Sequence, residues 1–167
     1  MMKYAIVYSS RTGNTKLLAE TLHAVLDPEE CIYFGAPGAA ALQADRIYAG
    51  FWTDQGSCDA DAAAFLDTVT DQQVFLFGTA GFGGSSDYFD HILENVQRHL
   101  SSEAAVVGRF MCQGKMPLSV RARYEKMQLS PAPNPRLQAL IENFDQALSH
   151  PDAADLEALR GAVRSIT

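Results

Sequence analysis

Short apolar runs alternate with longer amphipathic stretches along the first two-thirds of this 167-residue chain. The apolar runs are residues 4–8, 31–34, 47–51, 74–77 and 104–111. The stretches between them carry apolar residues at helical spacing, as expected for helices that connect strands. Such strands are joined by right-handed crossovers into a parallel sheet with both faces covered. We therefore predict an α/β fold with a doubly wound, five-stranded parallel sheet.

The last part of the chain, residues 115–167, shows helical patterns without a further strand. The proline-rich segment 130–135 separates two of these helices, and Asn134 followed by Pro135 is the expected start of the second. The apolar stripe of this second helix is expected to cover the sheet. We predict one domain for the whole chain, with its ligand-binding core in residues 1–114 and extra helices after it.

Composition excludes several classes of function. The net charge is −7, and a protein of that charge lacks the basic face that nucleic acids require. The three cysteines are too few and too far apart for a disulfide framework or a CxxC metal site, and the four histidines form no metal-ligand pair. No apolar run is long enough for a signal peptide or a membrane span. We therefore expect a cytoplasmic protein without metal, membrane or nucleic acid as a partner.

The turn between the first predicted strand and the first predicted helix is a candidate anion site. Its sequence, SSRTGNT at residues 9–15, combines hydroxyl side chains with a glycine at the start of a helix. Free N–H groups and the helix dipole at such a place favour a phosphate, and the lack of a Walker lysine favours anchorage without phosphoryl transfer. A hydroxyl-rich capping turn is the alternative. The candidate residues are Ser10, Thr12, Gly13, Asn14 and Thr15.

The segment after the third predicted strand, residues 51–56, holds the only tryptophan of the chain. An aromatic side chain at a strand end can stack on a flat heterocycle. A core or rim position for this tryptophan is the alternative. The candidate ligand-binding residues here are Phe51, Trp52, Thr53 and Asp54.

A glycine-rich loop, residues 78–86, follows the fourth predicted strand. Glycine allows the backbone to approach a ligand closely, and the alternative is a flexible turn without a ligand. The loop does not match the G-x-G-x-x-G motif of dinucleotide sites. The candidate residues here are Thr79, Ala80, Gly81, Phe82 and Gly83.

Together these three strand ends describe a site for a mononucleotide with a planar ring. SSRTGNT resembles the flavodoxin phosphate loop, [TS]-x-T-G-x-T, and the order of the later loops is also similar to that of flavodoxins. The resemblance covers about residues 3–114 and one covering helix. It implies a flavodoxin-like fold that binds FMN, with the isoalloxazine ring between residues 51–56 and 79–84.

Four stretches, YSSRTGNTKLLAE, GFWTDQG, VFLFGTAGFGG and CQGKMP, are similar to those of small flavodoxin-family proteins that accompany bilirubin reductase in anaerobic bacteria. This resemblance implies an electron carrier for a partner reductase, with no catalytic residue of its own. One alternative is a small NAD(P)H-dependent FMN reductase that acts on quinone-like acceptors. The other is a non-redox binding or regulatory module.

Charge is unevenly distributed along the chain. Residues 54–103 contain nine acidic residues and one basic residue. We expect this run to place a negative field near the ring, which disfavours the reduced anion and attracts a basic partner, with a solvated acidic surface as the alternative. Residues 109–126 are basic instead. For Arg11 the sequence leaves phosphate and solvent open, and for Cys112 it favours a buried structural thiol over a pocket position.

Overall fold

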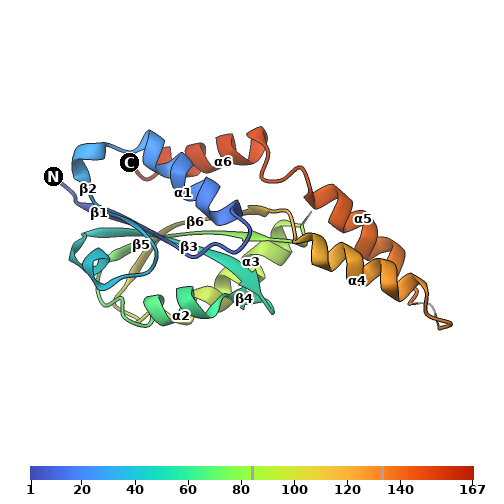
Figure 1. The fold of residues 1–167 in the computed structure, drawn as a ribbon. Helices are drawn as coiled ribbons and strands as arrows, with labels where there is room; N and C mark the ends of the chain where they lie inside the picture. The colour runs from blue at the N-terminus through green and yellow to red at the C-terminus, as the bar shows by residue number, and fades with distance from the viewer. Residues whose placement is uncertain (84, 133) are drawn as a thin grey trace.

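The computed structural model describes residues 1–83, 85–132 and 134–167. Its centre is a sheet of five parallel strands in the order β2-β1-β3-β5-β6 (Figure 1). A short sixth strand, β4 (Ser57–Cys58), pairs antiparallel with the end of β3. The prediction of a five-stranded parallel sheet is confirmed, with β4 as an addition. The parallel strands are β1 (Tyr4–Tyr8), β2 (Cys31–Gly35), β3 (Arg46–Asp54), β5 (Gln73–Ala80) and β6 (Ala105–Gln113).

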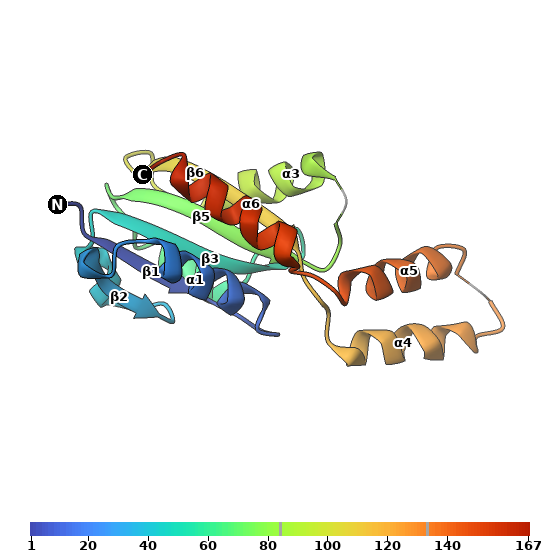
Figure 2. The same ribbon diagram turned by 90° about the horizontal axis from the view of Figure 1, so that it is seen from above.

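Helices cover both faces of the sheet. One face is covered by α1 (Asn14–Val25) and α6 (Ala153–Arg164), as Figures 1 and 2 show. The other face is covered by α2 (Ala60–Leu66) and α3 (Ser86–Gln97). This is the doubly wound arrangement that the sequence predicts. The connections also contain the short 3-10 turns η1 (Pro28–Glu30) and η2 (Ala39–Gln43).

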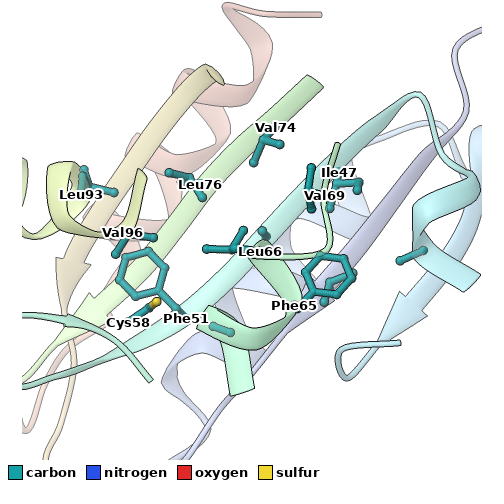
Figure 3. Close-up of a cluster of buried hydrophobic side chains, with 14 of the residues drawn as sticks. Ile47, Phe51, Cys58, Phe65, Leu66, Val69, Val74, Leu76, Leu93 and Val96 are labelled. Atoms are coloured by element: carbon teal, nitrogen blue, oxygen red, sulfur yellow. The ribbon is translucent and has the colours of Figure 1, made fainter. Parts of the chain in front are cut away.

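Each face of the sheet has its own apolar core. Under α2 and α3, Phe51, Leu66 and Val96 belong to one cluster of buried side chains (Figure 3). On the opposite face, Leu18 of α1 and Leu159 of α6 belong to a second cluster and are fully buried. The second core holds α1, and with it the preceding turn, in a fixed position at the carboxyl end of β1.

The strand β3 is longer than predicted: it reaches Asp54, so Trp52, Thr53 and Asp54, expected in a loop after the strand, are strand residues. Pairing with β4 extends β3 beyond the predicted end, and Gln55 and Gly56 form the connecting turn with φ angles of 51° and 82°. Alternate side chains of a strand face opposite sides of the sheet, so Phe51 shares a face with Ile47 and Ala49. All three pack in the core under α2 and α3.

The helices α4 (Leu118–Gln128) and α5 (Leu137–Ala147) form a hairpin that projects beyond the end of the sheet (Figure 2). The prediction that α5 covers the sheet is wrong. The apolar stripe of α5 packs with Tyr124 of α4 in a separate cluster. The sheet face is occupied by α6 instead, through Leu159 and Val163.

The helix α5 also begins later than predicted, because Arg136 and not Asn134 precedes its first turn. The Asn134 side chain accepts the N–H of Arg136 at 2.9 Å, and its carbonyl accepts the N–H of Leu137 at 3.0 Å. Asn134 therefore stabilises a turn before the helix. Pro133 in the predicted break and Gly84 in the predicted glycine loop lie outside the described residues.

Candidate functional site

A cavity of about 290 Å³ opens at the carboxyl ends of β1, β3, β5 and β6. This is where an open α/β sheet places its ligand, and the volume is near the lower end of the roughly 300–1,000 Å³ of small-molecule sites. A larger groove of about 580 Å³ runs between α3 and the edge strand β6, but no predicted site residue lines it. The predicted residues that line the strand-end cavity are Thr12, Asn14, Thr15, Trp52, Thr53, Thr79, Ala80, Gly81 and Phe82.

The turn before α1 leaves backbone donors free at the cavity. Gly13, with a φ of 89°, is the residue before the first turn of α1. The Ser10 hydroxyl accepts the N–H groups of Gly13 at 3.2 Å and Lys16 at 3.3 Å. Among the described residues, no hydrogen bond uses the N–H of Asn14 or Thr15. Two donors at the positive end of the helix dipole thus remain for an anion.

The side chains of this turn are tied to the segment after β6. Asn14 donates through Nδ2 to the carbonyl of Lys115 at 2.9 Å, and the Thr12 hydroxyl donates to the same carbonyl at 3.4 Å. The N–H of Lys115 donates to the carbonyl of His150 at 3.0 Å. The start of α1 and the wall of the cavity opposite it are therefore held at a fixed spacing.

The Thr15 side chain is directed into the protein rather than into the cavity. Its hydroxyl donates to the carbonyl of Phe51 at 3.0 Å and lies 3.2 Å from the hydroxyl of Thr79. Thr53 donates to the carbonyl of Thr79 at 2.8 Å. The Thr15 hydroxyl thus fixes the start of α1 to β3 and β5, and the Thr53 hydroxyl joins those two strands, so Thr15 faces an anion with its backbone.

Aromatic side chains line the remaining part of the cavity. Trp52 is half-buried, Phe82 is 42% exposed, and Tyr88 projects from α3. Burial raises the pKa of Tyr88, so its hydroxyl remains a neutral hydrogen-bond donor. The guanidinium of Arg11 lies over the Trp52 ring, 5.5 Å from its centroid. These side chains offer flat apolar surface for a planar ring.

Some predicted residues do not line the cavity. Phe51 is 1% exposed and contributes only its backbone carbonyl, because its side chain belongs to the core on the other face of the sheet. Asp54 is exposed and outside the wall, although its neighbours Thr53 and Gln55 line it. The other predicted residues outside the wall are Ser10, Gly13 and Gly83.

The sequence reasoning missed one complete wall of the cavity. Met116 leads into α4, and its side chain packs directly against Gly81. A Cβ on Gly81 would lie only 2.5 Å from Cγ of Met116. Gln113 and Asn143 donate to the carbonyl of Gly81 at 3.0 and 3.1 Å. The end of β6 is a strand end like the others, so the rule that located the first three segments also applies there. The wall residues not named as candidates are Arg11, Gln55, Gly56, Tyr88, Gly114, Lys115, Met116, Pro117 and Val120. The first three of them lie within the predicted segments 9–15 and 51–56.

The charge of the cavity wall differs from the expectation. Arg11 and Lys115 line it, and no carboxylate does so within the described part of the chain. None of the nine acidic residues of 54–103 lines the wall, and four of them, Asp61, Asp87, Asp90 and Glu94, lie on α2 and α3. The hypothesis of a negative field from acids beside the ring therefore has no support in the wall itself.

Other titratable groups lie outside the cavity wall. Cys112 is 3% exposed, and burial raises its pKa well above the usual thiol range, as expected for a structural thiol. His150 lies 2.6 Å from a carboxylate oxygen of Asp155, and Asp152 and Asp155 form the capping box of α6. The N–H of Asp155 holds the pKa of Asp152 below its usual value. No helix in the described residues is long and apolar enough to cross a bilayer.

Comparison with known proteins agrees with this arrangement. The flavodoxin domain model matches residues 5–164. A protein from Clostridium symbiosum named flavodoxin-like domain-containing protein BilS is 40% identical, over 95% of this chain and 93% of that protein. A Clostridioides difficile protein of the same name is 30% identical, over 93% of this chain and 90% of that protein.

Solved structures show the same fold. A short-chain flavodoxin associated with a non-canonical PDU bacterial microcompartment matches with a TM-score of 0.53 at 16% identity, and all of both chains is covered. At that identity the likeness concerns the fold alone. The family match and the two relatives cover nearly the whole chain. The chain therefore belongs to the flavodoxin family.

Proposed function

We propose that this protein binds FMN in the strand-end cavity and transfers electrons to a partner reductase. The flavodoxin domain supports FMN as the cofactor. The observation that carries the proposal is the pairing of two features in one cavity. The free N–H groups of Asn14 and Thr15 suit a phosphate, and the surfaces of Trp52 and Phe82 suit a planar ring.

The residues present fit both ends of FMN. The start of α1 offers uncharged donors and a helix dipole to the phosphate. The backbone of β5 and of the following glycine loop lines the cavity through Thr79, Ala80 and Gly81, and Met116 packs against Gly81 where a side chain would otherwise lie. When bound, FMN supplies the redox chemistry. The protein holds the phosphate, covers part of the ring and keeps water from the covered part.

An open cavity beside an exposed aromatic residue supports contact with a partner. Phe82 is 42% exposed at the cavity wall, so a second protein can approach a cofactor held there. The two relatives carry the name BilS, and the four similar stretches point to proteins that accompany bilirubin reductase. We therefore take a bilirubin reductase as the proposed electron acceptor.

Cofactor binding is tested by reconstitution. Purified protein is stripped of flavin, titrated with FMN and then with riboflavin, which has the same ring without the phosphate. We expect FMN to bind with a shifted visible absorption spectrum and riboflavin to bind at least about tenfold more weakly, because the phosphate contacts are lost. A protein that binds neither flavin contradicts the proposal, and equal affinities place the phosphate outside the turn before α1.

The direction of electron flow needs a second experiment. The FMN-loaded protein is mixed with NADH or NADPH without oxygen, alone and with a bilirubin reductase. For a carrier we expect no rapid bleaching by the nicotinamide alone. We also expect protein that has first been reduced with dithionite to be reoxidised when the reductase and bilirubin are present. Rapid bleaching without a second protein would instead indicate a stand-alone FMN reductase.

A further inference from the structure

Arg11 lies at the aromatic part of the cavity, and its guanidinium forms no ion pair with another described residue. Its guanidinium carbon lies 5.5 Å from the centroid of Trp52, and both residues line the cavity. Within the described residues, no hydrogen bond or ion pair to a protein group includes Arg11. A cation held over an indole ring in this way is positioned by the ring quadrupole. Its N–H donors therefore remain available to a ligand in the cavity.

The charge environment makes this cation significant. In the described chain, the charged groups of the cavity wall are Arg11 and Lys115, both positive. The Lys115 carbonyl accepts from Asn14, which places the backbone of that lysine beside the turn before α1. Arg11 is thus the cation that lies against the aromatic surface, whereas the backbone of Lys115 lies near the proposed phosphate position.

The chemistry of the flavin ring gives this cation a specific effect. The oxidised ring is neutral. Uptake of two electrons and one proton leaves one negative charge on the ring, whereas uptake of a second proton leaves it neutral again. A nearby cation stabilises the anion and has little effect on the neutral oxidised ring. The phosphate carries the same charge in both redox states.

We propose that Arg11 stabilises bound reduced FMN relative to bound oxidised FMN and so raises the reduction potential of the bound cofactor. This inference rests on the proposed binding of FMN. In this inference Arg11 acts on the charge of the reduced ring, whereas the turn before α1 binds the phosphate. The inference also reverses the expectation, drawn from the acidic run, of a field that disfavours the reduced anion.

The test compares affinities for the two redox states. The dissociation constants of oxidised FMN and of dithionite-reduced FMN are measured without oxygen for the wild type and for Arg11→Gln. Two further variants serve as controls. Arg11→Lys keeps the charge, and Lys16→Gln removes a cation of α1 that pairs with Glu20 at 4.0 Å outside the cavity wall.

We expect Arg11→Gln to weaken the binding of reduced FMN by about fivefold or more, while the affinity for oxidised FMN changes by less than about twofold. Arg11→Lys and Lys16→Gln should keep the ratio of the two constants within about twofold of the wild type. The reduction potential of the bound cofactor, measured against a reference dye, should fall in Arg11→Gln alone.

Two outcomes overturn this inference while the proposed function stands. Equal weakening of both redox states in Arg11→Gln would make Arg11 a partner of the phosphate, because the phosphate charge is constant. Unchanged constants would place Arg11 outside the field of the ring. If the wild type binds FMN in neither state, the proposed function itself fails, and the two failures are therefore distinguishable.

Discussion

The Asn14 side-chain amide donates to the Lys115 carbonyl across 2.9 Å and so joins the turn before α1 to the segment that leads into α4. Gly114 lies directly against this contact, because a Cβ at that position would overlap the amide nitrogen of Asn14. The hydrogen bond and the glycine together set the distance between the proposed phosphate position and the segment 114–117 of the cavity wall.

Substitution of Gly114 tests this contact. We expect Gly114→Ala to lower the free energy of unfolding by about 1–3 kcal/mol, because Asn14 is buried and cannot move away freely. Urea denaturation measures the change. In an Asn14→Ala background the same substitution should cost clearly less. An equal cost in both backgrounds would show that the overlap with Asn14 is not the cause.

Phe51 lies in the core and Phe82 at the cavity, so substitutions of the two residues should have different effects. We expect Phe51→Leu to lower the free energy of unfolding by about 1–2 kcal/mol, since it leaves space in a packed core, and to leave FMN affinity nearly unchanged. Phe82→Leu should weaken FMN binding and leave the free energy of unfolding nearly unchanged, because Phe82 is 42% exposed at the cavity. Urea denaturation and FMN titration of both variants check this. A large loss of FMN affinity in Phe51→Leu with unchanged stability would contradict the placement of Phe51.

The Thr15 hydroxyl has a structural role that a matched threonine on the same helix lacks. Thr15→Ala leaves the carbonyl of Phe51 without this donor, so we expect a loss of about 1–3 kcal/mol in stability and weaker FMN binding. Thr21, also buried on α1, donates only to the Leu17 carbonyl within the helix. Thr21→Ala should have a much smaller effect in both measurements, and similar losses in the two variants would argue against the network.

The buried thiols predict a pattern of reactivity and of pH dependence. Burial raises the pKa of Cys58 from 9.0 to about 11 and that of Cys112 higher still, whereas Cys31 is only half-buried. At pH 8 we expect a thiol reagent to modify Cys31 first and the other two only after unfolding. Rapid modification of all three thiols in the folded protein would contradict the burial.

The same shifts fix the sign of the alkaline effect. The folded protein holds the thiol protons more tightly than the unfolded chain, so this contribution to stability is complete at pH values below the unperturbed thiol pKa of 9.0. It is lost as the pH rises from there through the folded values. The urea midpoint should therefore be lower at pH 10 than at pH 8. A variant with alanine at both Cys58 and Cys112 should show a smaller difference between the two pH values.

The strands and the turn before α1 could be predicted because their signals are local. Each buried strand is a short apolar run, and SSRTGNT at residues 9–15 carries its helix start in its own sequence. The full length of β3 could not be predicted in the same way. It depends on the pairing of Thr53 and Asp54 with β4, which adds strand beyond the apolar run. The core position of Phe51, by contrast, follows from the alternation of side chains within residues 47–51.

The hairpin shows a second limit of local patterns. The apolar stripe of α5 is visible in the sequence, but the stripe itself does not say which surface covers it. Tyr124 of α4 covers it, while α6 takes the place on the sheet. The contribution of Met116 to the cavity depends on this placement, so that wall could be located only by applying the strand-end rule to β6.

The hairpin of α4 and α5 joins the cavity through a small number of contacts, notably those of Asn143 and Met116 with Gly81. Within residues 1–83, 85–132 and 134–167, neither helix belongs to a cluster that covers the sheet. Changes in the length or composition of this arm can accordingly reshape the entrance without disturbing the β-ladder. The cavity entrance and the sheet are thus held together by separate sets of contacts, which makes the hairpin a natural target for grafting and directed evolution.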